Sequence, residues 1–240
     1  MIGTLIRNFD IVKKSFVDAF NSDGTNTPIN DYYYEKGNRG LKLFVPKSDY
    51  FEMKCFEDLL KVYGCGLKKI LTDLMIPNAV DETTQLDIVF INRSGIYVVE
   101  AKNYNCIVEY HDDKTWLRRE FNGIVSKFQS PIEQNENHIN NLRKILSECD
   151  ESYFNSIITF ADKCVIRYDA QYEKYNAKVL NLKDLKNTVK DMTKAKEIVF
   201  SDDEIYDIYH RLSEYTKVGA LAKNKHIDYV NRIKRKKERK

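Results

Sequence analysis

The chain has 240 residues, a formal net charge of +3, 42% apolar residues and 31% charged residues. This balance predicts a packed core beneath a charged surface and excludes global disorder. No stretch approaches the ~18 consecutive apolar residues of a membrane-spanning helix, and nine Gly with four Pro exclude a collagen-like or low-complexity chain.

The first predicted element is a helix over residues 5–20, where apolar residues recur every three or four positions. Residues 21–31 have the composition of a loop. A second helix is predicted over 50–63, and a strand over 68–75 that Pro77 ends.

The next segment predicts a β-hairpin. Residues 85–91 and 96–102 are rich in β-branched and apolar side chains, and the sequence Asn-Arg-Ser-Gly at 92–95 is a turn signal. Two more strands are predicted at 107–110 and 115–119.

The second half of the chain predicts further strands and helices. Pro131 suits an early helical position, and the helix is predicted to continue to Leu146. Residues 156–160 and 164–167 are expected to form a strand pair. The remaining predicted elements are a strand at 179–182 and helices at 183–193, 201–215 and 218–235.

This order of elements predicts an α/β (α+β) fold, in which helices flank one central mixed β-sheet and a small helical C-terminal extension follows. The expected division is an N-terminal helix and loop over 1–49, a core domain over 50–182, and a helical extension with a basic tail over 183–240.

The basic tail contrasts with the rest of the chain. Residues 223–240 carry nine Lys and Arg against Asp228 and Glu238, a net charge of +7, whereas the other 222 residues carry 30 cations and 34 anions, a net charge of −4. Such a tail suits a polyanion contact, although a short charge run by itself is more often a solvated helix end.

The cysteines and histidines argue against a disulfide framework and against a zinc site. Five cysteines without a CxxC pair predict free thiols in a reducing compartment, and the four histidines do not stand at zinc-ligand spacings beside them.

The hairpin carries the charged residues that could bind a metal or take part in catalysis. Strand alternation places Glu100 and Lys102 on one face at the end of an apolar strand, and Asp87 interrupts the preceding strand. Charged groups there are costly unless they are paired, hydrated or bound to a metal. Two carboxylates on adjacent strands would suit Mg²⁺ or Mn²⁺, although each residue alone is also common in ordinary strands.

Several motifs in order resemble the PD-(D/E)xK nuclease superfamily, and more closely its nuclease-related domain, NERD. The matching segments are Thr-Gln-Leu-Asp at 84–87, Ser-Gly-Ile-Tyr-Val-Val-Glu-Ala-Lys-Asn-Tyr at 94–104, Trp116, and Pro-Ile-Glu-Gln-Asn at 131–135 with His138. The resemblance covers about residues 50–165 and implies that the core domain has a restriction-endonuclease-like fold.

The resemblance also implies roles for individual residues. Asp87 and Glu100 would be the metal ligands, and Lys102 would position or activate the attacking water. Glu57 would project from the helix predicted at 50–63, the first helix of the core domain, as an added metal or water contact, and Gln134 would complete the site.

Some positions depart from the family pattern. Phe56 stands where the family often has Gly before the helix Glu, and Ile88 where it often has His. Cys106 and Ser130 replace a common Gly and Asn. All five proposed site residues are nevertheless present. Without the resemblance, the polar helix positions Gln134, His138 and Asn141 would be predicted to face solvent.

Two functions follow from these patterns. The first is a nuclease that requires Mg²⁺ or Mn²⁺ and cleaves nucleic acid, with DNA favoured over RNA as the substrate. The second is an inactive nucleic-acid-binding or interaction module that keeps the nuclease fold. Charged residues break up the apolar N-terminal residues, so no secretory signal is expected and the cytoplasm is the expected location.

Overall fold

The structure is a computed structural model that describes residues 47–78, 82–168 and 177–216. The predicted helices at 5–20 and 218–235, the loop at 21–31 and the basic tail lie outside the described residues. No helix within the described part is long and apolar enough to cross a membrane.

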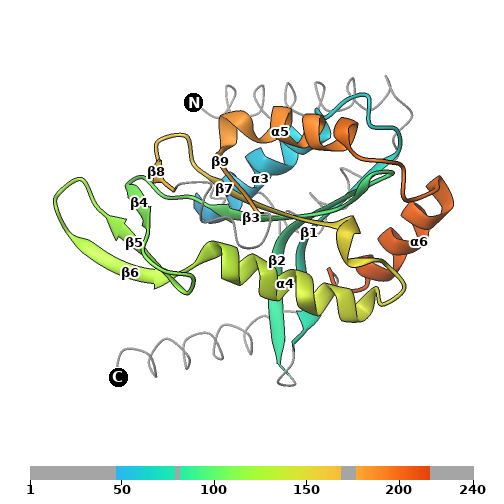
Figure 1. Cartoon of the computed structure of the whole chain (residues 1–240), viewed down its shortest axis with the longest axis horizontal. Helices are drawn as coiled ribbons and strands as arrows, with labels where there is room; N and C mark the ends of the chain where they lie inside the picture. Colours follow the sequence, from blue (N-terminus) through green and yellow to red (C-terminus); the bar gives the residue numbers. More distant parts are fainter. Residues whose placement is uncertain (1–46, 79–81, 169–176, 217–240) are drawn as a thin grey trace, which may run out of the picture.

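The described part of the chain begins with a helix and six strands, continues with a helix and three strands, and ends with two helices (Figure 1). In chain order they are α3 (Lys47–Leu60), β1 (Lys68–Pro77), β2 (Thr83–Asn92), β3 (Gly95–Lys102), β4 (Ile107–Tyr110), β5 (Thr115–Arg119), β6 (Val125–Gln129), α4 (Pro131–Ile145), the 3₁₀ turn η1 (Glu151–Tyr153), β7 (Phe154–Phe160), β8 (Val165–Arg167), β9 (Lys178–Asn181), α5 (Leu182–Ala195) and α6 (Asp202–Ser213).

The main sheet has five strands in the order β1-β2-β3-β7-β9. The first three strands are antiparallel, and β7 and β9 continue the sheet in parallel. Helices α3 and α5 cover one face, while α4 and α6 cover the other (Figure 1). The predicted α/β architecture with a mixed sheet and flanking helices is confirmed.

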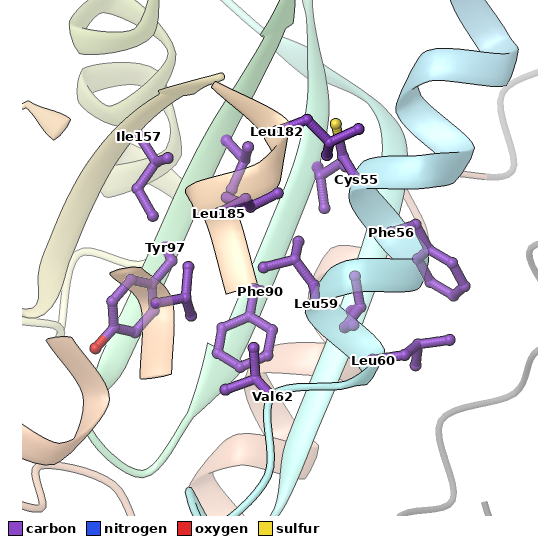
Figure 2. Close-up of a cluster of buried hydrophobic side chains, with 14 of the residues drawn as sticks. Cys55, Phe56, Leu59, Leu60, Val62, Phe90, Tyr97, Ile157, Leu182 and Leu185 are labelled. Carbon is purple, nitrogen blue, oxygen red and sulfur yellow. The ribbon is translucent and has the colours of Figure 1, made fainter. Parts of the chain in front are cut away.

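The central strand β3 is buried on both faces. Tyr97 and Val99 pack into the core beneath α3 and α5, together with the residues drawn in Figure 2, whereas Ile96 and Val98 pack towards α4 and α6. A strand covered on both faces reads as a continuous apolar run, which explains the sequence of this segment.

The predicted hairpin is confirmed as β2 and β3. Asn92 pairs with Gly95, and the Asn92 side chain accepts a hydrogen bond from the Ser94 backbone N–H at 3.0 Å. Gly95 has φ 137°, and a Cβ there would lie 2.4 Å from the Tyr153 carbonyl oxygen. The turn therefore requires glycine at this position.

A second sheet of four strands, in the order β6-β5-β4-β8, lies beside the main sheet. The prediction of one sheet is wrong in this respect, and β6 was not predicted because its exposed residues show no apolar alternation. Residues 156–160 and 164–167 do form strands, but β7 pairs with β3 and β8 pairs with β4. The expected pairing between them is therefore wrong.

The last two helices belong to the packing of the main sheet. In α5, Leu182, Leu185 and Val189 are buried in the core shared with α3. In α6, Ile205 and Leu212 are buried in the core shared with α4. Residues after 182 thus contribute to both faces of the sheet.

Candidate active site

Asp87 lies where β2 separates from β3. The paired residues run from Asn92 and Gly95 to Ile88 and Val99. At the next position the Asp87 carboxylate, rather than a backbone carbonyl, accepts the hydrogen bond from the Ala101 N–H at 2.8 Å. The carboxylate is therefore fixed at the opening between the two strands.

Glu100 and Lys102 project to the same face of β3, as the alternation predicts. The Glu100 side chain is 2% exposed and forms an ion pair with the Lys102 ammonium. Lys102 also donates a hydrogen bond to Gln134 Oε1 at 3.0 Å. The strand end and the first turn of α4 thus bring three of the predicted site residues together.

Helix α4 presents two further polar side chains to this face of the sheet. His138 is buried, and its Nδ1 lies 3.4 Å from Glu100 Oε2. Asn135 is fully buried and donates hydrogen bonds to the Val98 carbonyl and to Ser156 Oγ, both at 2.9 Å. The His138 contact belongs to the candidate site, whereas the Asn135 hydrogen bonds anchor α4 to β3 and β7.

Periodicity alone assigns Gln134, His138 and Asn141 to a solvent-facing side of α4, but only part of that side is exposed. His138 turns inward because charged side chains at the end of β3 offer it a polar partner. Asn141 stays partly exposed, where it accepts a hydrogen bond from Lys144 at 3.1 Å.

Helix α4 begins where the sequence predicts. Pro131 occupies the first turn, and the Ser130 side chain caps the helix by accepting a hydrogen bond from the Glu133 N–H at 3.4 Å. This start positions Gln134 one turn into the helix, opposite Lys102.

The structure does not bring Glu57 into this cluster. The charges that act on its carboxyl are those of its helix neighbours Lys61, Asp58 and Lys54, while burial raises its pKa. Glu57 remains a predicted site residue on sequence grounds.

Glu52 is the α3 carboxylate whose charge acts on Asp87. Sequence reasoning missed it. The available signal was its spacing, because Glu52 stands three positions before Cys55, which is buried against the strands and also senses the Asp87 charge. A partly buried acid on that side of a helix is more informative than one beside lysines.

Burial and charge drive the two strand carboxylates apart in pKa. Burial raises the pKa of Asp87 well above its usual value, and the nearby charges of Glu100 and Glu52 raise it further. Burial also acts to raise the pKa of Glu100, but Lys102 and His138 overcome it and bring the pKa to about 2.

The same charges keep Lys102 protonated. Burial acts to lower its pKa, but Glu100 and Asp87 together raise it above the ordinary lysine value. A protonated ammonium can donate hydrogen bonds and stabilise negative charge, and it cannot accept a proton from water.

The donor set suits a hard divalent cation. Asp87 and Glu100 supply oxygen atoms, and Glu100 Oε2 is buried, with His138 Nδ1 3.4 Å away and no hydrogen bond of good geometry to a described residue. Within the described ranges, no group of three His, Cys, Asp or Glu residues is gathered closely enough to hold a metal by itself. Because Mg²⁺ is usually bound through one or two carboxylates, with water and substrate phosphate as its other ligands, two carboxylates are sufficient.

Comparison with known proteins relates part of this chain to a protein family. Residues 50–161 match the nuclease-related domain, NERD. An uncharacterized protein of Bacillus anthracis is 26% identical over 200 residues, which cover 81% of this chain and 89% of the relative. No solved structure matches the chain. Residues 50–161 are therefore similar to a nuclease-related domain, of the general kind grouped as PD-(D/E)xK nucleases.

Proposed function

We propose that the protein is a nuclease that depends on Mg²⁺ or Mn²⁺ and hydrolyses phosphodiester bonds in nucleic acid, with DNA favoured over RNA as the substrate. The observation that carries the proposal is the buried Glu100–Lys102 pair beside Asp87 at the end of the central strand. Buried charges are costly, and perturbed carboxylates at a strand end are typical of active sites.

Asp87 and Glu100 would hold the metal, with Glu52 near Asp87 and Glu57 retained as the candidate from sequence. The chemistry that such an ion supplies when bound is neutralisation of phosphate charge and a lower pKa for water. The protein supplies the two anionic ligands, one of them already ionised because of its pKa of about 2.

Lys102 would orient the attacking water and stabilise the negative charge that develops on the phosphate. Water would attack phosphorus in line, forming a new P–O bond while the bond to the leaving oxygen breaks. Gln134 and Glu100 fix the ammonium from two sides, so its position is set before substrate binds. The raised pKa of Lys102 favours this role over that of a general base.

A cleavage assay on labelled DNA and RNA, with Mg²⁺, Mn²⁺ or EDTA, tests the proposal. We expect cleavage of DNA with either metal and none with EDTA. Glu100→Ala should reduce the rate by at least about 10²-fold, because it removes a metal ligand and leaves Lys102 without its partner. Unchanged cleavage by this variant would overturn the assignment of the site.

The second candidate is an inactive module that binds nucleic acid. It is favoured by the Lys102 ammonium on Glu100, which competes with a cation, and by the absence of a three-ligand cluster in the described part of the chain. Metal-independent binding without cleavage in any condition would select this candidate.

A further inference from the structure

The second sheet presents two neighbouring arginines to opposite faces. Arg118 is on the same face of β5 as the buried Trp116, and Arg119 is on the other face. Each arginine forms one ion pair of similar exposure, Arg118 with Glu120 at 2.5 Å and Arg119 with Glu109 at 2.7 Å. The two pairs differ in what lies beside them.

Arg118 lies over a tyrosine that follows the catalytic lysine. Its guanidinium carbon is 5.0 Å from the centre of the Tyr104 ring. Tyr104 is two residues after Lys102, and its backbone N–H donates to the Lys102 carbonyl at 2.9 Å. One aromatic ring therefore connects the arginine to the candidate site.

The tyrosine is held firmly in this position. Its ring packs against Phe160, the β7 partner of Lys102, at 6.1 Å between centroids, and against Phe128 of β6 at 5.6 Å. A guanidinium stacked on a fixed ring loses little further freedom when it binds an anion.

The guanidinium has unused capacity for an acceptor. Arg118 Nε is buried and makes no hydrogen bond of good geometry to a described residue, and the weak acceptor Cys106 Sγ lies beside the guanidinium. Its ion pair with Glu120 involves partly exposed side chains, 41% and 29% exposed, and such pairs contribute little stability. A phosphate, which arginine can bind through two N–H groups, could replace Glu120.

We propose that Arg118 is a substrate-positioning residue that binds a nucleic-acid phosphate adjacent to the one cleaved, while Glu120 competes with that phosphate for the guanidinium. This inference rests on the proposed function. It assigns to β5, a strand of the second sheet, a contact with the substrate beside Lys102.

The test measures binding of the full chain to a fluorescently labelled DNA duplex over a series of salt concentrations. All variants carry Glu100→Gln, which prevents cleavage during the measurement. Arg118→Ala should weaken binding about tenfold and reduce the slope of log K against log salt by about 1, because one phosphate contact is lost. Arg118→Lys should fall between this variant and the parent.

The Glu120 variant gives the opposite sign. Glu120→Gln should tighten binding about threefold by removing the competing carboxylate, and the double variant Arg118→Ala/Glu120→Gln should bind like Arg118→Ala alone. A purely structural role for Arg118 would not produce this tightening. Arg119→Ala and Glu109→Gln are the matched controls from the other face, and both should bind like the parent.

Equal binding by the Arg118→Ala and Arg119→Ala variants would overturn the inference, and so would a parent chain that does not bind DNA. If the wild type cleaves DNA but Arg118→Ala binds normally, only this inference fails. If the chain binds DNA through Arg118 but never cleaves it, the proposed nuclease activity fails and the assignment of Arg118 stands.

Discussion

Asp87 and Glu100 lie beside the same lysine, yet their pKa values move in opposite directions. Glu100 has the Lys102 ammonium in contact and His138 Nδ1 3.4 Å away, whereas Asp87 accepts a hydrogen bond from one backbone N–H and is repelled by two other carboxylates. The site therefore holds one fixed anion and one carboxyl that favours its proton until a further positive charge arrives.

The raised pKa of Asp87 predicts a stability effect. The folded state favours the protonated form, so its contribution to stability is present below the unfolded pKa of about 3.9 and is lost as pH rises through the folded pKa. Asp87→Asn, which keeps an acceptor for the Ala101 N–H, should therefore raise the unfolding temperature at neutral pH in EDTA.

Thermal unfolding measured with and without Mg²⁺ checks this prediction. Mg²⁺ should raise the unfolding temperature of the wild type more than that of Asp87→Asn, since only the wild type relieves charge repulsion on binding. A domain of this size gains about 2–4 °C per kcal/mol of stability. An Asp87→Asn variant that is less stable than the wild type at neutral pH in EDTA would contradict the prediction.

Two glutamates of α3, Glu52 and Glu57, differ in the charged groups that surround them. Glu52 acts on Asp87, whereas Glu57 is surrounded by Lys54, Asp58 and Lys61. If the charge near the metal ligands matters, Glu52→Gln should lower the cleavage rate about tenfold or more, and Glu57→Gln should leave it near the wild-type value. Rates of both variants under equal Mg²⁺ decide between them, and the reverse order would restore Glu57 to the site.

At the scale of elements, the second sheet is held to the main sheet by aromatic packing. Trp116 is fully buried, with Phe160 of β7 and Tyr168 stacked near it at centroid distances of 6.2 and 5.3 Å. The β5–β6 turn, by contrast, exposes Phe121 and Ile124 at 64% and 61%. The hairpin is thus anchored at its base and open to solvent at its tip.

This contrast predicts unequal costs for two aromatic substitutions. Trp116→Ala should destabilise the protein by about 3–5 kcal/mol because it leaves a cavity between the sheets, and Phe121→Ala should change stability by less than about 0.5 kcal/mol. Denaturant unfolding of both variants measures the difference. Similar midpoints for the two would show that the Trp116 cluster does not join the sheets.

At the scale of the whole molecule, the parts of the candidate site come from one end of the central strands of the main sheet. Strands β2 and β3 supply Asp87, Glu100 and Lys102. Helices α3 and α4, which cover opposite faces of the sheet (Figure 1), supply Glu52 and Gln134. The second sheet begins with β4, which follows β3 in the chain, and it carries Arg118.

The sequence by itself determined the β2–β3 hairpin, the start of α4, and the place of Asp87, Glu100 and Lys102 at one end of that hairpin. These are local properties, since a turn signal, a capping serine and strict alternation act within a few residues. The prediction that Glu100 and Lys102 share a face needed no knowledge of the rest of the chain.

Only the tertiary structure decided which distant elements meet. The split into two sheets, the separate partners of β7 and β8, and the inward turn of His138 depend on contacts between residues far apart in sequence. The same is true of Glu52 and Glu57, because both are acids on one helix and only the position of α3 over the strands distinguishes them. Periodicity defines the faces of an element, whereas packing determines what each face contacts.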